Sequence, residues 1–475
     1  MLKRVTYSSL IDGKWIDNNQ KFSVYNPSNQ NVIAQVADVG KEGAEQAIIS
    51  AHRAFLTWSQ TTSDERFDVL NNWFNLILKN KEELSKIITL ESGKPIRESL
   101  VEVEYGASFI KWFAEQAKRI KGSILSSNDK SKRMLIIKQP IGVVSAITPW
   151  NFPLAMIARK TSAALAAGCT VVLKPSELTP ITAIRIAELS IKAGFPKGIF
   201  NVVNGFPLPI GEVMSTHKYV KKITFTGSTK VGKYLMKNAS NTVKGISMEL
   251  GGNAPFIIFD DANLDESIEG FVMCKFRNAG QTCISANRLF VHEKIYNIFI
   301  EKLIKRVKKF SIDDGFKNPD IGPLISKKAI LKVEEHIEDA TLKGAKILLG
   351  GKKSKKGKLF FEPSILTNVT KNMKVFEEEN FGPIIPVIRF SEDIEVIKLC
   401  NFTNYGLAAY FYTNNQKRIW EVSEKLEYGM FGINTGKIST YQNPFGGWKE
   451  SGIGREGSEE GLEPFLEKKF VTWKI

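Results

Sequence analysis

The hydrophobic pattern of the chain changes its period along its length. After a short β-rich start, apolar residues recur at three- and four-residue spacing over residues 41–60, 64–90 and 95–121, which predicts three helices. A polar stretch between two apolar segments then predicts a hairpin over residues 122–140. Over residues 141–238, short continuous apolar runs alternate with helical segments. This pattern is typical of a parallel sheet covered by helices on both faces.

A second alternation of strands and helices follows. It begins with GISMEL and NAPFIIFD (residues 245–250 and 253–260) and continues to about Trp420, with an amphipathic helix over residues 294–310. The C-terminal segment FLEKKFVTWKI alternates like an edge strand, so it could join another sheet, including one in a partner subunit. The chain is therefore predicted to be an α/β protein with two sheet-containing units.

Length and composition place the chain among ordinary globular proteins. It has 475 residues, of which 43% are hydrophobic and 24% charged, enough for two or three domains. The longest apolar run, residues 162–173, is too short to span a bilayer, and the N-terminus shows no secretory signal. We therefore expect a cytoplasmic protein with no membrane partner. Four cysteines and four histidines at irregular spacing predict neither disulfides nor a metal site.

The net charge of +16 raises the alternative of a nucleic-acid-binding protein. The basic residues, however, are spread along the chain and mixed with acids. The densest run, KKSKKGK at residues 352–358, lies before a strand-like segment, where a solvated loop belongs. We therefore expect no nucleic-acid partner, although a basic surface would still attract small anionic substrates.

One cysteine stands in surroundings that suit chemistry. Cys283 lies in the polar segment GQTCIS, whereas Cys169 and Cys400 lie in apolar surroundings, as most cysteines do. No histidine is near Cys283 in the sequence, so a general base would have to be a carboxylate. Glu249 in MELGGN is a candidate, because burial between Met248 and Leu250 would raise its pKa toward the range of a general base.

Three further segments could carry functional groups. TPWNFP presents Asn151 on a turn between prolines, where its amide suits an oxyanion donor, although a helix cap is the simpler alternative. In KKITFTGSTKVG a strand ends before Gly227 and a helix begins near Ser228, so this helix start could bind phosphate or merely be capped. Lys174 and Glu177 follow another strand, where they could hold ribose hydroxyls or lie in a solvated loop.

These segments belong to an ordered set of seven motifs: TPWNFP, VVLKPSE, FTGST, MELGGNAP, NAGQTC, EEENFGP and PFGGWKESGIGREG. Over essentially the whole chain the set resembles the aldehyde dehydrogenase superfamily. The resemblance implies that Cys283 is the nucleophile, that Glu249 activates the hydrolytic water, and that Asn151 with the Cys283 N–H forms the oxyanion hole. An aldehyde would then be oxidised to a carboxylic acid with NAD(P)+ through a thiohemiacetal and a thioester on Cys283.

The same resemblance implies the domain organisation and the cofactor contacts. We expect a Rossmann-like cofactor domain (residues 1–121 and 141–248), an α/β catalytic domain (249–440) and a small β oligomerisation element (122–140 and 456–475). A homodimer or homotetramer is therefore expected. The expected cofactor contacts are Thr148, Trp150, Lys174, Ser176, Glu177, Gly227, Ser228, Glu379 and Phe381.

Within the superfamily, the chain is most similar to the succinate-semialdehyde dehydrogenases, as seen in KFRNAGQTC, LAAYFYT, YGMFGINTG and GREGS. This similarity implies that Arg159, Arg277 and Thr440 bind the substrate carboxylate, because a guanidinium pair provides charge-assisted hydrogen bonds. A structural salt bridge is the alternative role for either arginine.

Other details of the sequence bear on regulation, cofactor and substrate. Ser285 occupies the position where some relatives carry a second cysteine as a redox switch, so no such switch is expected. A carboxylate at Glu177 would repel a 2′-phosphate, which favours NAD over NADP. The loop STYQNPFGG lacks the usual acidic character, which leaves the chain length of the substrate open. Malonate or glutarate semialdehyde, apolar aldehydes, a CoA-acylating reaction and a catalytically silent scaffold are the alternatives.

Overall fold

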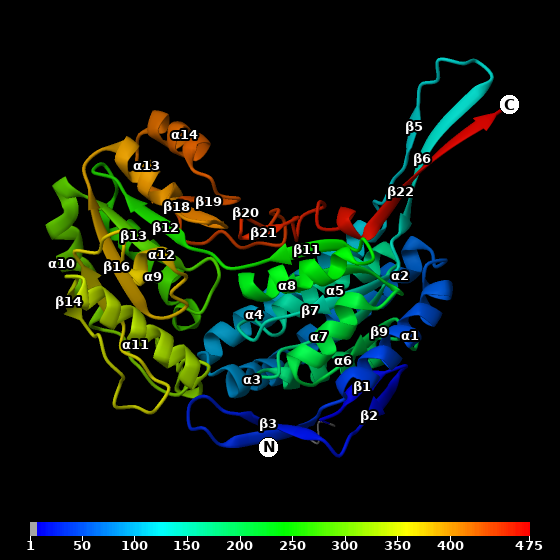
Figure 1. The fold of residues 1–475 in the computed structure, drawn as a ribbon, viewed down its shortest axis with the longest axis horizontal. Helices are drawn as coiled ribbons and strands as arrows, with labels where there is room; N and C mark the ends of the chain where they lie inside the picture. Colours follow the sequence, from blue (N-terminus) through cyan, green and yellow to red (C-terminus); the bar gives the residue numbers. More distant parts are fainter. Residues whose placement is uncertain (1–6) are drawn as a thin grey trace.

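The computed structural model describes residues 7–475, which form two lobes and a projecting arm (Figure 1). The first lobe contains an eight-stranded sheet in the order β2-β1-β9-β8-β7-β10-β11-β21. The five strands from β9 to β11 are parallel, and the three outer strands pair antiparallel. The strands are β1 (Ser9–Ile11), β2 (Lys14–Ile16), β7 (Val143–Ile147), β8 (Thr170–Lys174), β9 (Phe200–Val202), β10 (Val220–Thr226), β11 (Gly245–Glu249) and β21 (Gly452–Ile453).

Helices cover both faces of this sheet. On one face α2 to α6 bury their apolar sides against β7, β8 and β9, and on the other face α1, α7 and α8 do the same. The parallel strands are buried on both sides, which is why they are continuously apolar in the sequence. The helices are α1 (Gly40–Trp58), α2 (Ser63–Lys79), α3 (Lys81–Ser92), α4 (Ile96–Ala117), α5 (Ala155–Ala167), α6 (Pro180–Lys192), α7 (Pro207–Thr216) and α8 (Thr229–Ser240).

The single helix predicted over residues 64–90 is wrong, because the structure has two helices there. Asn80 leaves the helical conformation (φ −102°, ψ 19°) and separates α2 from α3. Its side-chain amide donates to the Leu76 carbonyl (2.7 Å), and its side-chain oxygen accepts from Arg185 (3.2 Å). An asparagine side chain that bonds the nearby backbone competes with the helical hydrogen bonds, a local effect that apolar spacing does not report.

The second lobe contains a seven-stranded sheet in the order β14-β15-β16-β13-β12-β18-β19, in which only β14 is antiparallel to its neighbour. Its strands are β12 (Ala254–Ile258), β13 (Ala286–His292), β14 (Lys346–Leu349), β15 (Ser364–Thr367), β16 (Ile384–Phe390), β18 (Ala408–Tyr412) and β19 (Met430–Ile433). Its helices are α9 (Leu264–Phe276), α10 (Tyr296–Val307), α11 (Lys327–Leu342), α12 (Lys374–Glu377), α13 (Asp393–Asn401) and α14 (Gln416–Lys425). The predicted α/β class, with two such sheets, is confirmed.

The predicted place of one strand is wrong, because the strand belongs to the first sheet and not to the second. The segment GISMEL, expected to open the second unit, forms β11 and pairs in parallel with β10 of the first sheet, from Lys222–Gly245 to Thr226–Glu249. The second sheet therefore begins with β12. Two short strand pairs lie outside both sheets: β3 (Lys21–Tyr25) with β4 (Val32–Ala37), and β17 (Tyr405–Gly406) with β20 (Trp448–Lys449).

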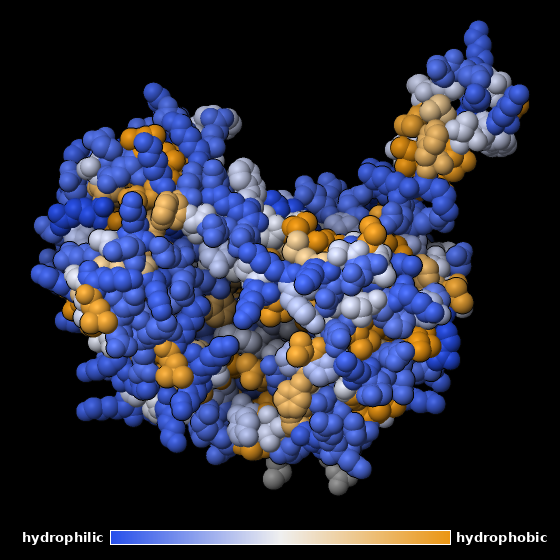
Figure 2. Space-filling model, viewed as in Figure 1, coloured by the Kyte–Doolittle hydropathy of each residue, from blue (hydrophilic) through white to orange (hydrophobic). Residues whose placement is uncertain are grey.

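The arm is a three-stranded sheet in the order β22-β6-β5, formed by β5 (Ser123–Leu125), β6 (Lys132–Pro140) and β22 (Leu466–Lys474). It contains the predicted hairpin and the predicted C-terminal edge strand, whose register runs from Leu466–Pro140 to Lys474–Lys132. The arm projects from the first lobe (Figure 1), and Figure 2 shows hydrophobic surface on it. Its exposed apolar residues include Ile124 (81% exposed), Phe470 (55%) and Trp473 (63%). Among residues 7–475, no helix is long and apolar enough to cross a membrane.

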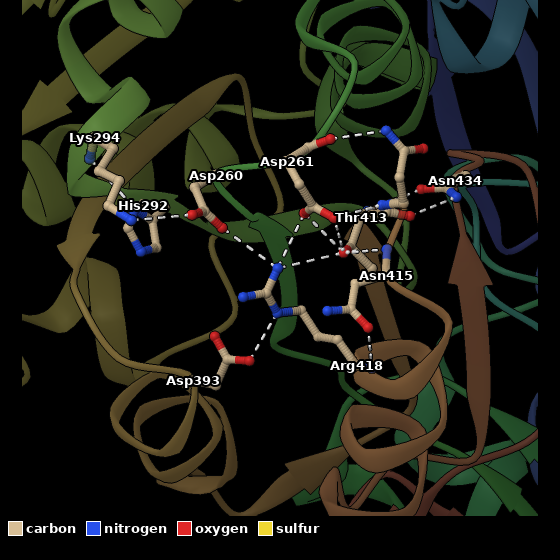
Figure 3. Close-up of polar contacts among 10 residues, drawn as sticks. Asp260, Asp261, His292, Lys294, Asp393, Thr413, Asn415, Arg418 and Asn434 are labelled. Carbon is tan, nitrogen blue, oxygen red and sulfur yellow. Dashed lines mark hydrogen bonds and ion pairs between the residues drawn. The ribbon is translucent and has the colours of Figure 1, made fainter.

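An ionic network fixes the helices at one end of the second sheet (Figure 3). The guanidinium of Arg418, in the first turn of α14, contacts Asp261 (3.0 Å) and Asp260 (3.3 Å) after β12, and Asp393 (2.7 Å) in the first turn of α13. Thr413 donates to both carboxylate oxygens of Asp261 (2.8 and 2.9 Å). Because one cation serves three carboxylates, this network ties both helices to the strand ends.

Candidate active site

A cavity of about 1150 Å³ lies between the two lobes, where Figure 2 shows the surface to be hollowed. The carboxyl ends of β7, β8 and β10 form one wall, and the segments before β13 and β16 form the other. Ligands of open α/β sheets bind beyond the carboxyl ends of the parallel strands. Of the predicted site residues, all line this cavity except Glu249 and Thr440.

Cys283 lies at the cavity wall, three residues before β13. The backbone that leads to it is strained, since Asn278 (φ 52°) and Ala279 (φ 56°) are both left-handed, followed by Gly280 (φ 80°). Burial raises the pKa of the Cys283 thiol to about 12, and the negative charge of Glu379 acts in the same direction. The thiol is therefore protonated here at neutral pH, and a base must remove its proton before it can act as a nucleophile.

Glu249, the last residue of β11, is a candidate general base because it is a carboxylate in a buried environment. It is only 2% exposed, and one carboxylate oxygen (Oε2) is buried without a hydrogen-bond partner among the described residues. Burial raises its pKa well above the usual value, as expected from its position between Met248 and Leu250, and the charge of Glu456 raises it further. Its neighbours Leu250 and Gly251 line the cavity in its place, so the carboxylate lies behind that wall.

Asn151 is held on the turn before α5. That helix begins at Ala155 with Leu154 as its N-cap, so the alternative role of Asn151 as the helix cap is excluded. Its side-chain NH₂ donates to the Gln281 carbonyl (3.1 Å), two residues before Cys283. An amide NH₂ carries two protons, so the second N–H remains for a ligand oxygen at the cavity.

The last residue of β8 and the turn that follows it form part of the cavity wall. Lys174 is 2% exposed, and its ammonium donates to the Pro175 carbonyl (2.8 Å) and lies 3.6 Å from the Glu177 carboxylate. The Ser176 hydroxyl accepts from the Leu178 N–H (3.2 Å), which shapes the turn. The Lys174–Glu177 pair is thus built into the cavity wall, and the solvated-loop alternative fails for Lys174.

The start of α8 has the features of an anion site. Ser228 is the N-cap and accepts from the Val231 N–H (3.4 Å), so its side chain does cap the helix. The remaining N–H groups of the first turn point beyond the helix end, where the dipole favours a phosphate. Gly227 and Ser228 line the cavity there, beside Thr226 and Thr148, whose buried hydroxyls have no hydrogen-bond partner within the described chain.

Glu379 and Phe381 approach the cavity from the loop before β16. Glu379 accepts from the Gly252 N–H (3.0 Å), and burial raises the pKa of this carboxyl to about 7. Phe381 has a left-handed backbone (φ 51°) and packs edge-on against Trp150, with ring centroids 5.6 Å apart. The aromatic pair joins the two lobes across the cavity.

The two arginines differ in how they are held. Arg159 is 1% exposed, and its Nε lies 2.6 Å from a Glu456 carboxylate oxygen, so the salt-bridge alternative is real for this residue. Its Nη1, however, is buried without a partner in the described chain, and the guanidinium stacks over Phe445 (4.2 Å). Arg277 lies over the Phe152 ring (5.0 Å) and forms no ion pair with a carboxylate of residues 7–475.

Thr440, the third residue expected to bind the substrate carboxylate, does not line the cavity. Its hydroxyl donates to Asn443 (3.0 Å), whereas the adjacent Ser439 lines the cavity. Tyr105 also lines it: burial raises the pKa of its phenol, while the charges of Arg159 and Arg277 and a hydrogen bond with Ser439 lower that pKa. The regular apolar spacing of α4 predicts that Tyr105 is a core residue, so the sequence does not indicate its place at the cavity.

Comparisons with known proteins agree with this geometry. The family model described as "Aldehyde dehydrogenase family" matches residues 15–471. A succinate-semialdehyde dehydrogenase [NADP(+)] of Escherichia coli is 50% identical, covering 98% of this chain and 97% of its own, and a glutarate-semialdehyde dehydrogenase of Pseudomonas aeruginosa is 49% identical (97% and 96%). The crystal structure of a Burkholderia pseudomallei succinate-semialdehyde dehydrogenase superposes with a TM-score of 0.98 at 46% identity (99% and 98%). The chain belongs to the aldehyde dehydrogenase family.

Proposed function

We propose that the protein oxidises succinate semialdehyde to succinate with NAD(P)+. The substrate assignment rests on one observation, the arginine pair at the cavity wall beside Cys283. Arg159 is oriented by Glu456 and Phe445 and keeps one unpartnered nitrogen, while Arg277 lacks a carboxylate partner among the described residues. A buried cation without full hydrogen bonding, such as Arg159, is costly, and a substrate carboxylate would accept hydrogen bonds from both guanidinium groups.

The chain's own residues account for the chemistry. After its proton passes to solvent water, Cys283 attacks the aldehyde carbon, and the second amide N–H of Asn151 donates a hydrogen bond to the oxyanion of the resulting thiohemiacetal. The adduct is oxidised to a thioester. Glu249 then takes a proton from water as that water attacks the thioester, the carboxylic acid is released as the C–S bond breaks, and Glu249 returns the proton to the Cys283 thiolate. Because its pKa is raised, Glu249 is a stronger base than an exposed glutamate.

The cavity also suits the dinucleotide that the family implies. When bound, a nicotinamide supplies the acceptor for the hydride that the adduct loses. The start of α8 and the Thr148 and Thr226 hydroxyls, which have no partner among residues 7–475, fit the pyrophosphate, and Lys174 fits the adenosine ribose. Trp150, Glu379 and Phe381 would hold the nicotinamide end.

We favour NAD over NADP for this chain because the Glu177 carboxylate would lie beside a 2′-phosphate. The E. coli relative is named as NADP(+)-dependent, so the choice requires a direct test. Glu177→Ser should improve kcat/KM for NADP relative to NAD, because it removes the negative charge. No change in that ratio would show that another residue sets the preference.

The same proposal extends to the organisation of the protein. The first lobe would bind the cofactor, the second lobe would carry the nucleophile, and the arm would bridge subunits of a homodimer or homotetramer through its exposed apolar residues. The four cysteines are all free thiols, which is consistent with the reducing cytoplasm.

Initial rates of reduced nicotinamide formation test the substrate. Succinate semialdehyde, glutarate semialdehyde and propanal are compared with NAD and with NADP. A strong preference for succinate semialdehyde is expected, because the arginine pair binds a carboxylate. Equal or better rates with propanal would refute the arginine clamp, and a preference for glutarate semialdehyde, the substrate in the name of the P. aeruginosa relative, would favour that alternative.

A further inference from the structure

A buried ion pair lies directly behind the turn that carries Asn151. The ammonium of Lys94 and the carboxylate of Glu102 in α4 form this pair, and neither side chain is exposed to solvent. Sequence reasoning assigned no role to either residue. A fully buried pair of this kind contributes little net stability compared with apolar side chains of the same volume. Its position beside the candidate oxyanion donor therefore calls for another explanation.

Both members of the pair bond the Asn151 turn. Lys94 Nζ donates to the Asn151 carbonyl (2.7 Å) and lies 4.1 Å from the centre of the Phe152 ring. Glu102 accepts from the N–H groups of Leu154 (2.9 Å) and Ala155 (3.3 Å), where a helix N-terminus favours a negative charge. The pair thus fixes the turn at its carbonyl and at the start of the helix that follows it.

The same helix also holds the loop on the other side of the cavity. Glu98, one turn before Glu102 in α4, accepts from the N–H of Asn278 (2.7 Å), a left-handed residue that precedes Cys283. The Asn278 side chain donates to the Asn151 carbonyl and to the Gln281 carbonyl (both 3.3 Å). Asn151 in turn donates to Gln281 (3.1 Å), so α4 and these bonds connect the two catalytic loops.

We propose that Lys94 and Glu102 are positioning residues that set the Asn151 carboxamide at the distance from Cys283 required for oxyanion binding. They touch neither substrate nor cofactor and act through the backbone of the Asn151 turn. Apolar residues could fill the same space, but they could not hold the Asn151 carbonyl in one orientation. This inference rests on the proposed role of Asn151 as the oxyanion donor.

The proposal predicts an effect on kcat rather than on binding. The double variant Lys94→Met/Glu102→Leu removes both charges together and leaves neither one buried alone. We expect its kcat to fall by roughly 10- to 100-fold, the effect of a small misplacement of a catalytic group. KM for the aldehyde and for the cofactor should stay within about twofold, because the binding surfaces are unchanged. Lys111→Met/Glu115→Leu, which removes a half-buried ion pair of the same helix, is the matched control.

A double-mutant cycle with Asn151→Ala separates positioning from a general structural effect. If the pair acts through Asn151, then Asn151→Ala costs much less in the Lys94→Met/Glu102→Leu background than in the wild type. Fully additive losses, or an unchanged kcat in the double variant, would overturn the proposal. If Asn151→Ala alone leaves kcat unchanged, the proposed role of Asn151 itself has failed. Lys94→Arg, which keeps the ion pair but displaces the donor, should lower kcat with little change in thermal midpoint and serves if the double variant does not fold.

Discussion

Replacement of Arg277 by methionine tests the substrate assignment most directly. Methionine keeps apolar contact with the Phe152 ring, over which the guanidinium lies at 5.0 Å. Arg277 forms no ion pair with a carboxylate of the described chain, so its removal leaves no unpaired anion behind. Arg159 is less suitable for this test, because its loss would change the charge balance around the buried Glu456 carboxylate.

The expected magnitude follows from the type of interaction and its burial. A hydrogen bond to a charged group contributes about 1.5–3 kcal/mol. Arg277 is only partly buried, so we take about 2 kcal/mol, which corresponds to a loss of about 30-fold in kcat/KM. The loss should appear in reactions with succinate semialdehyde, whereas propanal has no carboxylate to bind and should be affected by less than about twofold.

Initial rates with the two aldehydes at saturating cofactor measure this difference. Arg97→Met is the matched control, since Arg97 pairs with Asp320 (3.6 Å) at the surface of the same region. A selective loss with succinate semialdehyde supports the carboxylate clamp. Equal losses with both aldehydes would refute the reasoning, because they would show that Arg277 supports the Cys283 loop rather than the substrate.

Three further perturbations test other parts of the structure. Glu456→Gln removes a negative charge beside Glu249 and should lower the raised pKa of the Glu249 carboxyl. Because the base then stays ionised to lower pH, the acidic limb of the kcat–pH profile should move to lower pH. A limb that stays in place or moves to higher pH would contradict this expectation. His336→Phe removes the imidazole contacts to Asn380 (2.8 Å) and Glu378 (3.1 Å), the two residues that flank Glu379. KM for the cofactor should therefore rise about 5- to 10-fold, while KM for the aldehyde changes little. A rise in KM for the aldehyde alone would contradict this expectation. Arg418→Met leaves three carboxylates without their shared cation and should lower the free energy of unfolding by about 2 kcal/mol, as measured by urea denaturation. The loss should be smaller at high salt, which screens the charges. An unchanged urea midpoint at low salt would show that the network does not stabilise the fold.

The sequence predicted the fold where a local pattern determines the structure. Four parallel strands of the first sheet, β7 to β10, are short, apolar and separated by helices, as the alternating pattern over residues 141–238 predicts. The errors arose where the outcome depends on a contact elsewhere. The periodicity predicts that GISMEL is a strand but does not tell which sheet it joins. In the structure this segment is β11, which pairs with β10 of the first sheet. The break at Asn80 depends on a side chain that bonds the backbone and Arg185.

The candidate site shows the same division between reactive and supporting groups. Asn151 could be predicted because TPWNFP is a compact local motif with its own chemistry. Lys94 lies 57 residues earlier, in ESGKP, where the sequence suggests only the end of one helix before a proline. Only the packing of α4 against α5 places Lys94 and Glu102 behind the Asn151 turn. A residue that acts by holding another group needs no reactive side chain of its own, so its function is defined by distances that the sequence does not contain. Supports of this kind should therefore be sought among buried ion pairs whose bonds end on catalytic loops, because burial without a stability benefit points to a positional role.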